Sequence, residues 1–280
     1  MKFTKMQGCG NDYVYINCFE EKVENPNQLA IKMSNRNFGV GADGLILVMP
    51  SNIADCKMRM FNSDGSESEM CGNGIRCVGK FVYDKNIVKK DIITVETLAG
   101  IKTLEFFKDE NNIVLSVKVN MGEPIFKPKD IPVLSKEKDI VKNLKLRALD
   151  KEFVFTCVSM GNPHAVTFVD NVDDFNVDKY GAILEKDVAF PKRANIEFVE
   201  IIDKNNLKMR VFERGSGETF ACGTGTCATV VASFLNGKSN RENVNVTLLG
   251  GDLNITWDKK DNNVYMVGPA RFVFEGDWLL

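Results

Sequence analysis

The most constraining feature of this sequence is a turn rich in cysteine and glycine that occurs twice. Cys71 begins "CGNGIRC" and Cys222 begins "CGTGTCA", 151 residues later (positions 71 and 222) in a chain of 280. A repeat of this length predicts two similar domain-sized halves rather than a solenoid of short units. Three further matches share the offset: residues 57–61 with 208–212, 10–11 with 161–162, and 44–48 with 195–199.

Length and composition are compatible with two ordinary globular domains. A chain of 280 residues is long enough for two hydrophobic cores, and 44% of its residues are hydrophobic, 26% are charged and the net charge is −2. There is no basic excess of the kind that binds nucleic acid, and no apolar run approaches the roughly 20 residues of a membrane span. Residues 1–13 lack the apolar core of a signal peptide. We therefore expect a cytoplasmic protein without a nucleic-acid or membrane partner.

Short apolar and β-branched runs, such as "YVYIN", "LILVM" and "HAVTFV", recur between turn residues and predict a mostly β structure. Hairpin turns are expected at residues 109–112, 203–206 and 258–263, which are rich in Asp and Asn. Helices are expected from Pro26 to Asn35, from Asn176 to Glu185, and directly after each of the two repeated cysteines. These last two helices are apolar around most of their circumference, so burial is expected, and Gly237 is placed to end the second one.

The predicted fold class is α+β, with two similar pseudo-symmetric domains, each a mostly antiparallel curled sheet around a central helix. The first half is expected to comprise residues 1–120 plus 268–280, and the second half residues 121–267. The reason for the split is that "VGPARFVFEG" near the C-terminus resembles "NMGEPIF" at the end of the first half, so it could pair with the first domain. The active site is expected in the cleft between the halves.

The repeated cysteine lies where a helix would activate it. The N-terminus of a helix favours a thiolate, and its unpaired N–H groups bind carboxylates, which the adjacent glycines allow to approach closely. The chain has eight cysteines but one histidine and no C-x-x-C pair, so we expect no metal site. Each half would thus supply a reactive sulfur and a binding site for an anion.

Two such halves face to face would place one sulfur on each side of a ligand. That arrangement suits inversion of a carbon next to a carboxylate, in which one thiolate removes the proton and the opposing thiol donates one, while fixed N–H groups stabilise the developing charge. No cofactor is required. A redox pair, either Cys71 with Cys222 or Cys71 with Cys77, is an alternative. A phosphate-binding module is another, although the sequence lacks the usual nucleotide motifs.

Four segments, "GCGNDYVYI", "FNSDGSESEMCGNGIRC", "MGNPHAV" and "ERGSGETFACGTGTC", together resemble the diaminopimelate epimerase family, in order and over essentially the whole chain. The resemblance implies a cofactor-independent enzyme with two similar domains around an interdomain site, commonly a homodimer. Its small-molecule amino-acid substrate would be diaminopimelate, which such enzymes interconvert between the LL and meso forms on the route to lysine and peptidoglycan.

The resemblance also implies roles for individual residues. Cys71 and Cys222 would be the catalytic acid/base thiols, with His164 assisting the first and Glu213 the second. Backbone N–H groups at residues 72–73 and 223–224 would bind the reacting carboxylate, and Arg214 could grip the distal one bidentately. The implied substrate-binding residues are Asn11, Asn62, Gly72, Asn73, Asn162, Asn195, Glu213, Arg214, Gly223 and Thr224.

The sequence departs from the family pattern at two positions. Gln7 replaces a histidine found in many members, and Gly44 replaces a glutamine that reaches the substrate in some, which predicts a looser distal pocket. A racemase of another amino acid, such as histidine or a proline derivative, therefore remains an alternative with the same mechanism, although Arg214 and the asparagines favour a long diacid. A thiol switch or anion-binding protein is the non-enzymatic alternative, and it predicts no exchange of an α-proton.

Overall fold

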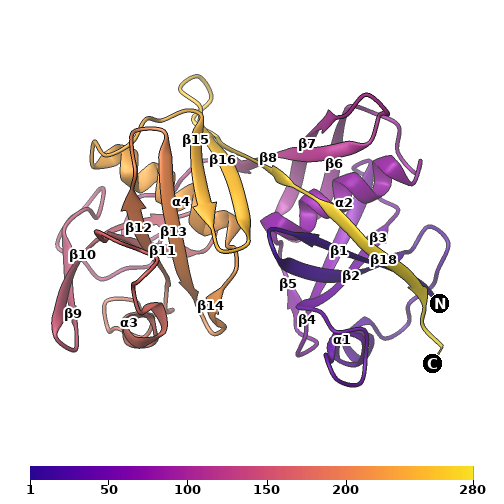
Figure 1. The fold of residues 1–280 in the computed structure, drawn as a ribbon, viewed down its shortest axis with the longest axis horizontal. Helices are drawn as coiled ribbons and strands as arrows, with labels where there is room; N and C mark the ends of the chain where they lie inside the picture. Colours follow the sequence, from indigo (N-terminus) through magenta and orange to yellow (C-terminus); the bar gives the residue numbers. More distant parts are fainter. Residues whose placement is uncertain (280) are drawn as a thin grey trace. The chain divides into compact units, whose positions relative to one another are not determined.

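The computed structural model describes residues 1–279, in which the chain forms four helices and a larger number of strands (Figure 1). The helices are α1 (Pro26–Ser34), α2 (Gly72–Asp84), α3 (Val177–Leu184) and α4 (Gly223–Leu235). The strands are β1 (Lys2–Gly8), β2 (Asn11–Asn17), β3 (Gly44–Met49), β4 (Cys56–Asn62), β5 (Glu67–Ser68), β6 (Ile92–Thr97), β7 (Gly100–Lys108), β8 (Val114–Gly122), β9 (Leu144–Ala148), β10 (Lys151–Ser159), β11 (Pro163–Phe168), β12 (Asn195–Ile201), β13 (Asn206–Glu213), β14 (Gly217–Thr219), β15 (Val244–Leu248), β16 (Gly251–Trp257), β17 (Val264–Pro269) and β18 (Arg271–Asp277).

The chain divides into two compact units. The first unit consists of residues 1–120 and 267–280, and the second of residues 121–266. In the first unit β1 pairs antiparallel with β2 and β18, β2 runs parallel to β3, and β4 runs parallel to β6. In the second unit β10 pairs antiparallel with β11, β11 runs parallel to β12, and β13 runs parallel to β15. The remaining strand pairs described in both units are antiparallel.

The strand registers repeat at the same offset as the sequence. Tyr13 lies opposite Gly44 in the first unit, and His164 lies opposite Asn195 in the second. The hairpin at the start of each unit is the exception. The β1–β2 turn closes between Gly8 and Asn11, whereas the corresponding β10–β11 turn is one residue longer, closing between Ser159 and Pro163. The two units are therefore repeats of one α+β design, as predicted. They differ locally in this turn, which precedes Asn11 in the first unit and contains Asn162 in the second.

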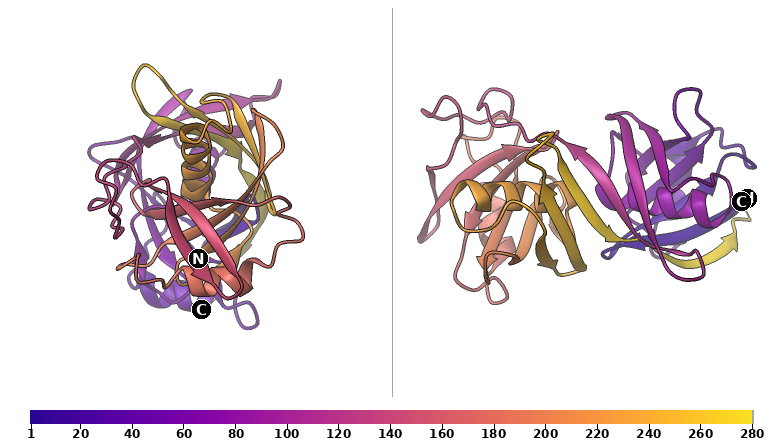
Figure 2. Two further views of the ribbon diagram at one scale, coloured as in Figure 1. Left: turned by 90° about the vertical axis from the view of Figure 1, so that its left-hand side faces the viewer. Right: turned by 90° about the horizontal axis from the view of Figure 1, so that it is seen from above.

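Each sheet curls around one buried helix. Figure 2 shows α4 enclosed by strands of the second unit, where it packs against β10, β11, β12, β13 and β16. In the first unit α2 packs against β1, β2 and β7. The central strands are covered on both sides: Leu45 and Leu47 of β3 pack with Ala30 of α1, while Ile46 points to α2. Burial on both faces explains why this strand is a continuous apolar run rather than an alternating one.

The predicted helices form within one residue of their expected ends. Cys71 and Cys222 are the N-cap residues of α2 and α4. Gly237 follows α4 with φ of +65°, and its N–H donates to the carbonyl of Phe234 at 2.8 Å, which is a glycine C-terminal stop. The three predicted hairpin turns connect β7 to β8, β12 to β13 and β16 to β17.

The last strand belongs to the first unit. β18 pairs antiparallel with β1, with Arg271 opposite Gln7 and Asp277 opposite Lys2. In the second unit the corresponding position beside β10 holds only an isolated bridge, between Ile125 and Ser159. The proline- and lysine-rich segment that follows leaves no strand among residues 126–143, because proline cannot donate to a ladder.

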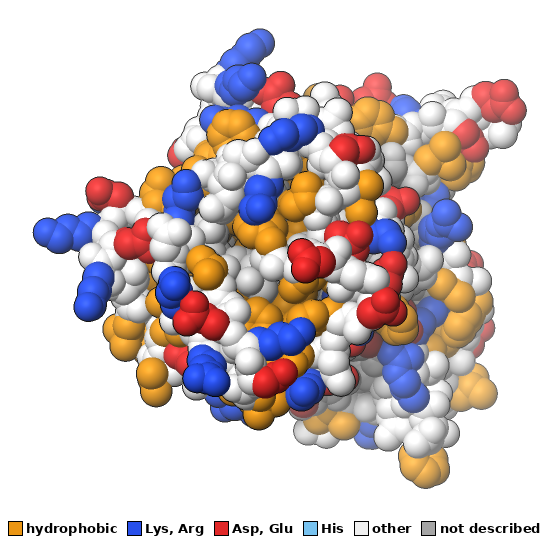
Figure 3. All heavy atoms as spheres, turned by 60° about the vertical axis from the view of Figure 1, so that its left-hand side comes forward, with side chains coloured by type: hydrophobic (Ala, Val, Ile, Leu, Met, Phe, Trp, Pro, Cys, Tyr) orange, Lys and Arg blue, Asp and Glu red, His pale blue; other side chains and the backbone are white. Residues whose placement is uncertain are grey.

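Charges of both signs are mixed over the face shown in Figure 3, so this face carries no broad basic area of the kind that binds nucleic acid. Within residues 1–279 no helix is both long enough and apolar enough to cross a bilayer.

Candidate functional site

The first unit gathers polar groups around the N-terminus of α2, and we call Asn11, Tyr13, Cys71 and Gly74 the Cys71 cluster. The Cys71 sulfur accepts a hydrogen bond from the Gly74 N–H at 3.4 Å, and its S–H donates to Asn11 Oδ1 at 3.2 Å. Tyr13 is hydrogen-bonded to the same sulfur. Burial raises the pKa of Tyr13 well above its ordinary 10.0, and the nearby Cys71 and Asp43 raise it further, so the hydroxyl keeps its proton.

The amide of Asn11 is held in place from behind. Its Nδ2 donates to Asp43 Oδ2 at 2.7 Å, and Asp43 in turn pairs with Arg36 at 2.9 Å. Burial raises the pKa of Asp43, as does the neighbouring charge of Asp12, while hydrogen bonds and Arg36 act in the opposite direction. Because the amide nitrogen is taken up by Asp43, the amide oxygen is left to face Cys71. The hydrogen bonds described at the Cys71 sulfur thus involve uncharged side chains and the end of a helix.

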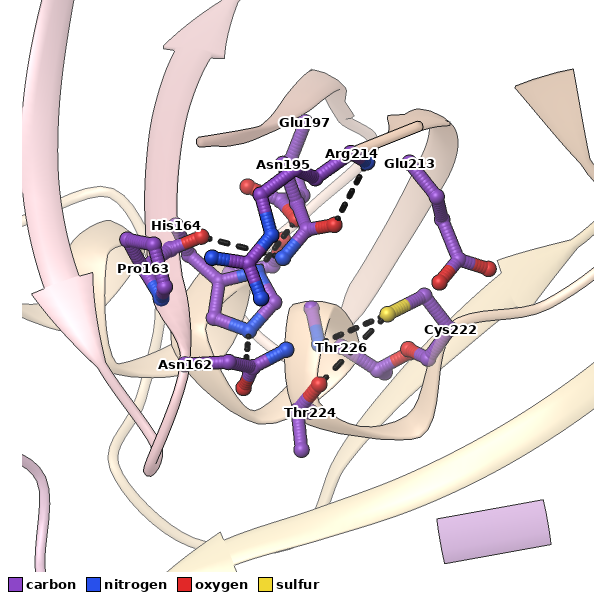
Figure 4. A network of polar contacts seen from close by, with 12 residues as sticks. Asn162, Pro163, His164, Asn195, Glu197, Glu213, Arg214, Cys222, Thr224 and Thr226 are labelled. Atoms are coloured by element: carbon purple, nitrogen blue, oxygen red, sulfur yellow. Dashed lines mark hydrogen bonds and ion pairs between the residues drawn. The ribbon is translucent and has the colours of Figure 1, made fainter. Parts of the chain in front are cut away.

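The second unit places a different set of groups around α4, and we call His164, Glu197, Glu213, Cys222 and Thr224 the Cys222 cluster (Figure 4). The Cys222 sulfur accepts a hydrogen bond from the Gly225 N–H at 3.4 Å and lies 3.5 Å from Thr224 Oγ1.

Carboxylates make this second thiol resist ionisation. Burial raises the pKa of Cys222 well above its ordinary value of 9.0, and the charges of Glu213 and Glu197 raise it further. Thr219 donates to Glu213 Oε1 at 2.5 Å, and Glu213 is itself hydrogen-bonded to Cys222. Burial also raises the pKa of Glu213. Cys222 is therefore a protonated thiol at neutral pH, beside a carboxyl group that can exchange a proton with it.

His164 is buried beside Cys222, on β11. Its Nδ1 lies 2.6 Å from Glu197 Oε1, and its Nε2 lies 3.0 Å from Asn162 Oδ1. Glu197 is on the neighbouring parallel strand β12, where its side chain points toward α4 like those of Asn195 and Val199. The parallel pairing of β11 with β12 thus brings the ring and the carboxylate together.

The "ERGSG" turn is fixed to the rest of the second unit by its backbone. Asn195 Nδ2 donates to the Pro163 carbonyl at 3.0 Å, and Asn195 Oδ1 accepts from the Arg214 N–H at 2.9 Å. The buried Glu185 accepts from the Gly215 N–H at 2.8 Å. The Arg214 side chain is exposed, so its guanidinium can reach a ligand from an anchored backbone.

The two clusters have the same frame but opposite electrostatic settings. In both, a cysteine caps a buried helix, which provides N–H groups for an anion. One sulfur has neutral hydrogen-bonding neighbours, whereas the other has two carboxylates. Within residues 1–279 no cysteine forms a disulfide, so both sulfurs can carry protons.

A comparison with known families assigns the chain. The sequence profile described as diaminopimelate epimerase matches residues 3–127 and 156–273, which is most of the chain and includes both clusters.

The chain belongs to the diaminopimelate epimerase family.

Relatives in this family align over nearly their full length. The diaminopimelate epimerase of Acetivibrio thermocellus is 61% identical over 277 residues, covering 99% of this chain and 98% of the relative. That of Methanococcus maripaludis strain S2 is 58% identical over 277 residues, covering 99% of both. The predicted enzyme class, an isomerase, is confirmed by this family membership.

Solved structures confirm the predicted fold. A PhzF-family phenazine biosynthesis protein from Bacillus anthracis superposes with a TM-score of 0.73 at 21% identity, covering 100% of this chain and 99% of that one. A hydroxyproline epimerase from Agrobacterium vitis gives a TM-score of 0.68 at 12% identity, covering 99% and 90%. At such low identities the likeness concerns the fold alone.

The structure brings several predicted site residues of this family member together. In the first unit Asn11 touches Cys71, while Gly72 and Asn73 form the first turn of α2 and Asn62 bonds Ser66 at the end of β4. In the second unit Glu213 and Thr224 touch Cys222, Asn162 touches His164, Asn195 touches Arg214, and Gly223 begins α4. The predicted action of His164 on Cys71 joins residues of different units and stays a prediction.

Sequence reasoning missed Tyr13, Asp43 and Glu197. Two signals could have revealed them. Tyr13 stands at the position that His164 takes in the second half of the repeat, and Glu197 interrupts the apolar run "NIEFV". Nothing in the sequence marks Asp43, because its role depends on a contact with Asn11 across the sheet.

The two departures from the family pattern have local explanations. Gln7 Oε1 accepts from the Gly10 N–H at 2.9 Å and so stabilises the β1–β2 turn. A Cβ at Gly44 would lie 2.2 Å from the Phe61 carbonyl oxygen and 2.9 Å from Cε1 of Tyr13. A side chain at this position would thus need a shift of the tyrosine ring or of the β4 backbone, and the looser distal pocket stays a prediction.

Proposed function

We propose that the protein interconverts LL- and meso-diaminopimelate without a cofactor, using Cys71 and Cys222 as acid/base groups on opposite faces of the substrate α-carbon. One observation carries the proposal: in both repeats the cysteine caps a buried helix, with its sulfur 3.4 Å from a first-turn N–H. A single cysteine that caps a helix need not have a catalytic role. Two in equivalent positions would supply the pair of bases that inversion at one carbon requires.

In the proposed step the Cys71 thiolate takes the α-proton, forming an S–H bond, while the Cys222 thiol gives its proton to the opposite face. The charge that develops on the substrate carboxylate is stabilised by the helix N–H groups at residues 72–73 and 223–224. After turnover the two sulfurs have exchanged protonation states, and the reverse reaction restores them. The substrate would lie in a cleft between the two units.

Neighbouring groups would return the sulfurs to their starting states. Glu213 is hydrogen-bonded to Cys222, and burial raises the pKa of Glu213, so its carboxyl group is suited to exchange a proton with this thiol. His164 would assist Cys71. Arg214 would bind the distal carboxylate of a diacid. The amides of Asn11, Asn62, Asn162 and Asn195 would bind the remaining polar ends.

Proton NMR in heavy water tests this proposal. With the wild-type enzyme, the α-proton signal of LL-diaminopimelate should disappear as the meso isomer forms. Cys71→Ala and Cys222→Ala should each lose the interconversion by at least about 10²–10⁴-fold, the usual contribution of one acid/base group. If the wild type exchanges no α-proton, the same assay with a panel including histidine and proline derivatives would separate another racemase from a thiol switch, for which every substrate would be silent.

Two further parts of the proposal follow from the family resemblance: a homodimeric state and a cytoplasmic location. Sedimentation equilibrium of the purified chain would test the first, and fractionation of cells that produce it would test the second.

A further inference from the structure

Glu197 is a buried carboxylate to which the proposed mechanism assigns no role. It lies in the middle of β12 and is 0% exposed to solvent. Its Oε1 is 2.6 Å from Nδ1 of His164, while its Oε2 has no hydrogen-bond partner within residues 1–279 (Figure 4). Burial of an ionised carboxylate is strongly unfavourable unless a partner compensates it. The only described partner of this carboxylate is the imidazole ring.

The internal repeat shows that the fold itself does not need an acid here. The residue that corresponds to Glu197 in the first unit is Ile46, and the residue that corresponds to His164 is Tyr13. A Cβ at Gly74 would lie 2.8 Å from Ile46 Cδ1, and a Cβ at Gly225 would lie 2.7 Å from Glu197 Oε1.

The isoleucine and the glutamate therefore occupy the same place against the first turn of the central helix. The first unit folds with an apolar side chain in that place. The second unit has a carboxylate and an imidazole where the first has an isoleucine and a phenol, so this exchange points to chemistry rather than to packing.

The hydrogen-bond pattern around the ring indicates which protonation state of His164 the carboxylate favours. One ring nitrogen faces Glu197 Oε1 and the other faces Asn162 Oδ1 at 3.0 Å, so each has an oxygen acceptor. A neutral imidazole has one N–H, whereas an imidazolium has two and satisfies both acceptors. The oxygen and nitrogen of the Asn162 amide are assigned from this same network, whereas an ionised carboxylate can only accept a hydrogen bond. Glu197 is therefore the acceptor that fixes a proton on Nδ1 of His164.

We propose that Glu197 is a positioning residue that holds His164 as a doubly protonated imidazolium, with Nδ1–H on Glu197 and Nε2–H directed at Asn162. His164 then serves the proposed reaction as a fixed cationic donor to an anion, and not as the base that removes a proton from a thiol. The activity part of this inference rests on the proposed epimerisation, but the protonation of the ring does not.

Other titratable groups face Glu197 from each neighbouring strand and from the helix. They are His164 on β11, Cys157 on β10, Glu213 on β13 and Cys222 at the start of α4. Burial raises the pKa of both thiols and of Glu213, which favours their uncharged forms. Among these groups only the histidine has a protonated form that is a cation.

NMR of the imidazole ring tests the proposal directly, because His164 is the only histidine of the chain. In the full-length protein labelled with ¹⁵N-histidine, both ring nitrogens should carry a proton at neutral pH. In Glu197→Gln one of the two N–H signals should be lost, whereas Glu197→Asp, which keeps the charge, should retain both. A wild-type ring with a single N–H, or a two-proton ring in Glu197→Gln, would overturn the proposal.

Kinetics provide the second readout. Glu197→Gln should lower kcat by about 10- to 100-fold while KM changes by less than about threefold, since the loss falls on the reacting state rather than on binding. Glu200→Gln, on the same strand but hydrogen-bonded to Val172 outside the Cys222 cluster, is the matched control and should keep both constants. Equal effects of the two changes on kcat would also contradict the proposal.

Two further points complete the test: a control for folding, and a result that distinguishes failure of this proposal from failure of the proposed function. The double change His164→Tyr with Glu197→Ile copies the Tyr13–Ile46 pair of the first unit, so it should melt within a few degrees of the wild type. If Glu197→Gln does not fold, the number of N–H protons on the wild-type ring still decides. Since NMR of the ring needs no substrate, a two-proton ring in a protein without epimerase activity would refute the proposed function alone.

Discussion

At the scale of single residues, the two thiols differ through their neighbours rather than through their backbones. Cys71 and Cys222 cap their helices in the same way, with sulfurs 3.4 Å from a first-turn N–H. Tyr13 and Asn11 give the first sulfur uncharged hydrogen bonds, whereas Glu213 adds a carboxylate to the second. In the proposed mechanism one thiol starts deprotonated and the other protonated, and the carboxylate of Glu213 favours the protonated form of Cys222.

The half-buried carboxyl of Glu213 should make stability depend on pH. Burial raises its folded-state pKa above the ordinary 4.5, so the folded chain binds this proton more tightly than the unfolded chain does. The contribution of Glu213 to the free energy of unfolding is therefore complete below pH 4.5 and is lost as pH rises through the folded-state pKa. The glutamine of Glu213→Gln cannot titrate, so the free energy of unfolding of this variant should increase relative to that of the wild type as pH rises. Urea unfolding across this pH range measures the difference.

The control for this prediction has the opposite sign. Hydrogen bonds from Arg59 lower the pKa of Glu67, so that carboxylate stabilises the fold above its ordinary pKa and stops doing so as pH falls. The free energy of unfolding of Glu67→Gln should therefore decrease relative to that of the wild type as pH rises. A parallel pH trend in the two variants would show that Glu213 does not titrate as we expect.

At the scale of secondary structure, the sequence predicted the helices well because their ends carry specific chemistry. The cysteine–glycine turns start α2 and α4, and Gly237 ends α4 with a positive φ. Strands β1 and β9 were not predicted, because "KFTKMQG" and "LKLRA" lack a β-branched run. Pairing with β18 and β10 makes them strands, and that pairing is a property of the assembled sheet.

Two glycines near α4 should respond differently to alanine. A Cβ at Gly225 would lie 2.7 Å from Glu197 Oε1 and 3.2 Å from the Cys222 sulfur, so Gly225→Ala must displace groups of the Cys222 cluster. We expect a loss of activity of at least about tenfold and destabilisation of about 1–3 kcal/mol. Gly237 has open space around it but a φ of +65°.

Gly237→Ala should therefore cost about 1 kcal/mol through backbone strain and leave activity unchanged. Steady-state kinetics and urea unfolding of both variants measure the two effects separately. Activity loss in Gly237→Ala as large as in Gly225→Ala would mean that helix stability, and not the geometry of the Cys222 cluster, controls catalysis.

At the scale of the whole molecule, the chain returns to its first unit at the end. β18 covers one edge of β1, and Phe274 packs edge-on against Phe3 with ring centroids 5.9 Å apart. Trp278 and Met1 exchange backbone hydrogen bonds of 2.7 and 3.0 Å, so the two ends of the described chain lie side by side.

Removal of residues 271–280 should therefore destabilise the first unit selectively. β1 would keep its pairing with β2 but lose its antiparallel pairing with β18, and so become an edge strand. Hydrogen exchange should accelerate for amides of β1, while β11 and β12 in the second unit should keep their protection. The full-length chain under the same conditions is the control, and uniform acceleration in both units would contradict this expectation.

The sequence by itself determined the duplicated design, the two capped central helices and the family. Each of these follows from local chemistry: glycine allows a tight turn, a cysteine before a helix becomes its cap, and a repeated motif needs a repeated frame. Tertiary structure alone decided which side chains meet in each cluster. Tyr13 reaches Cys71 and Glu197 reaches His164 because strand pairing sets their register, and whether a buried carboxylate is tolerated depends on the group that the fold places beside it.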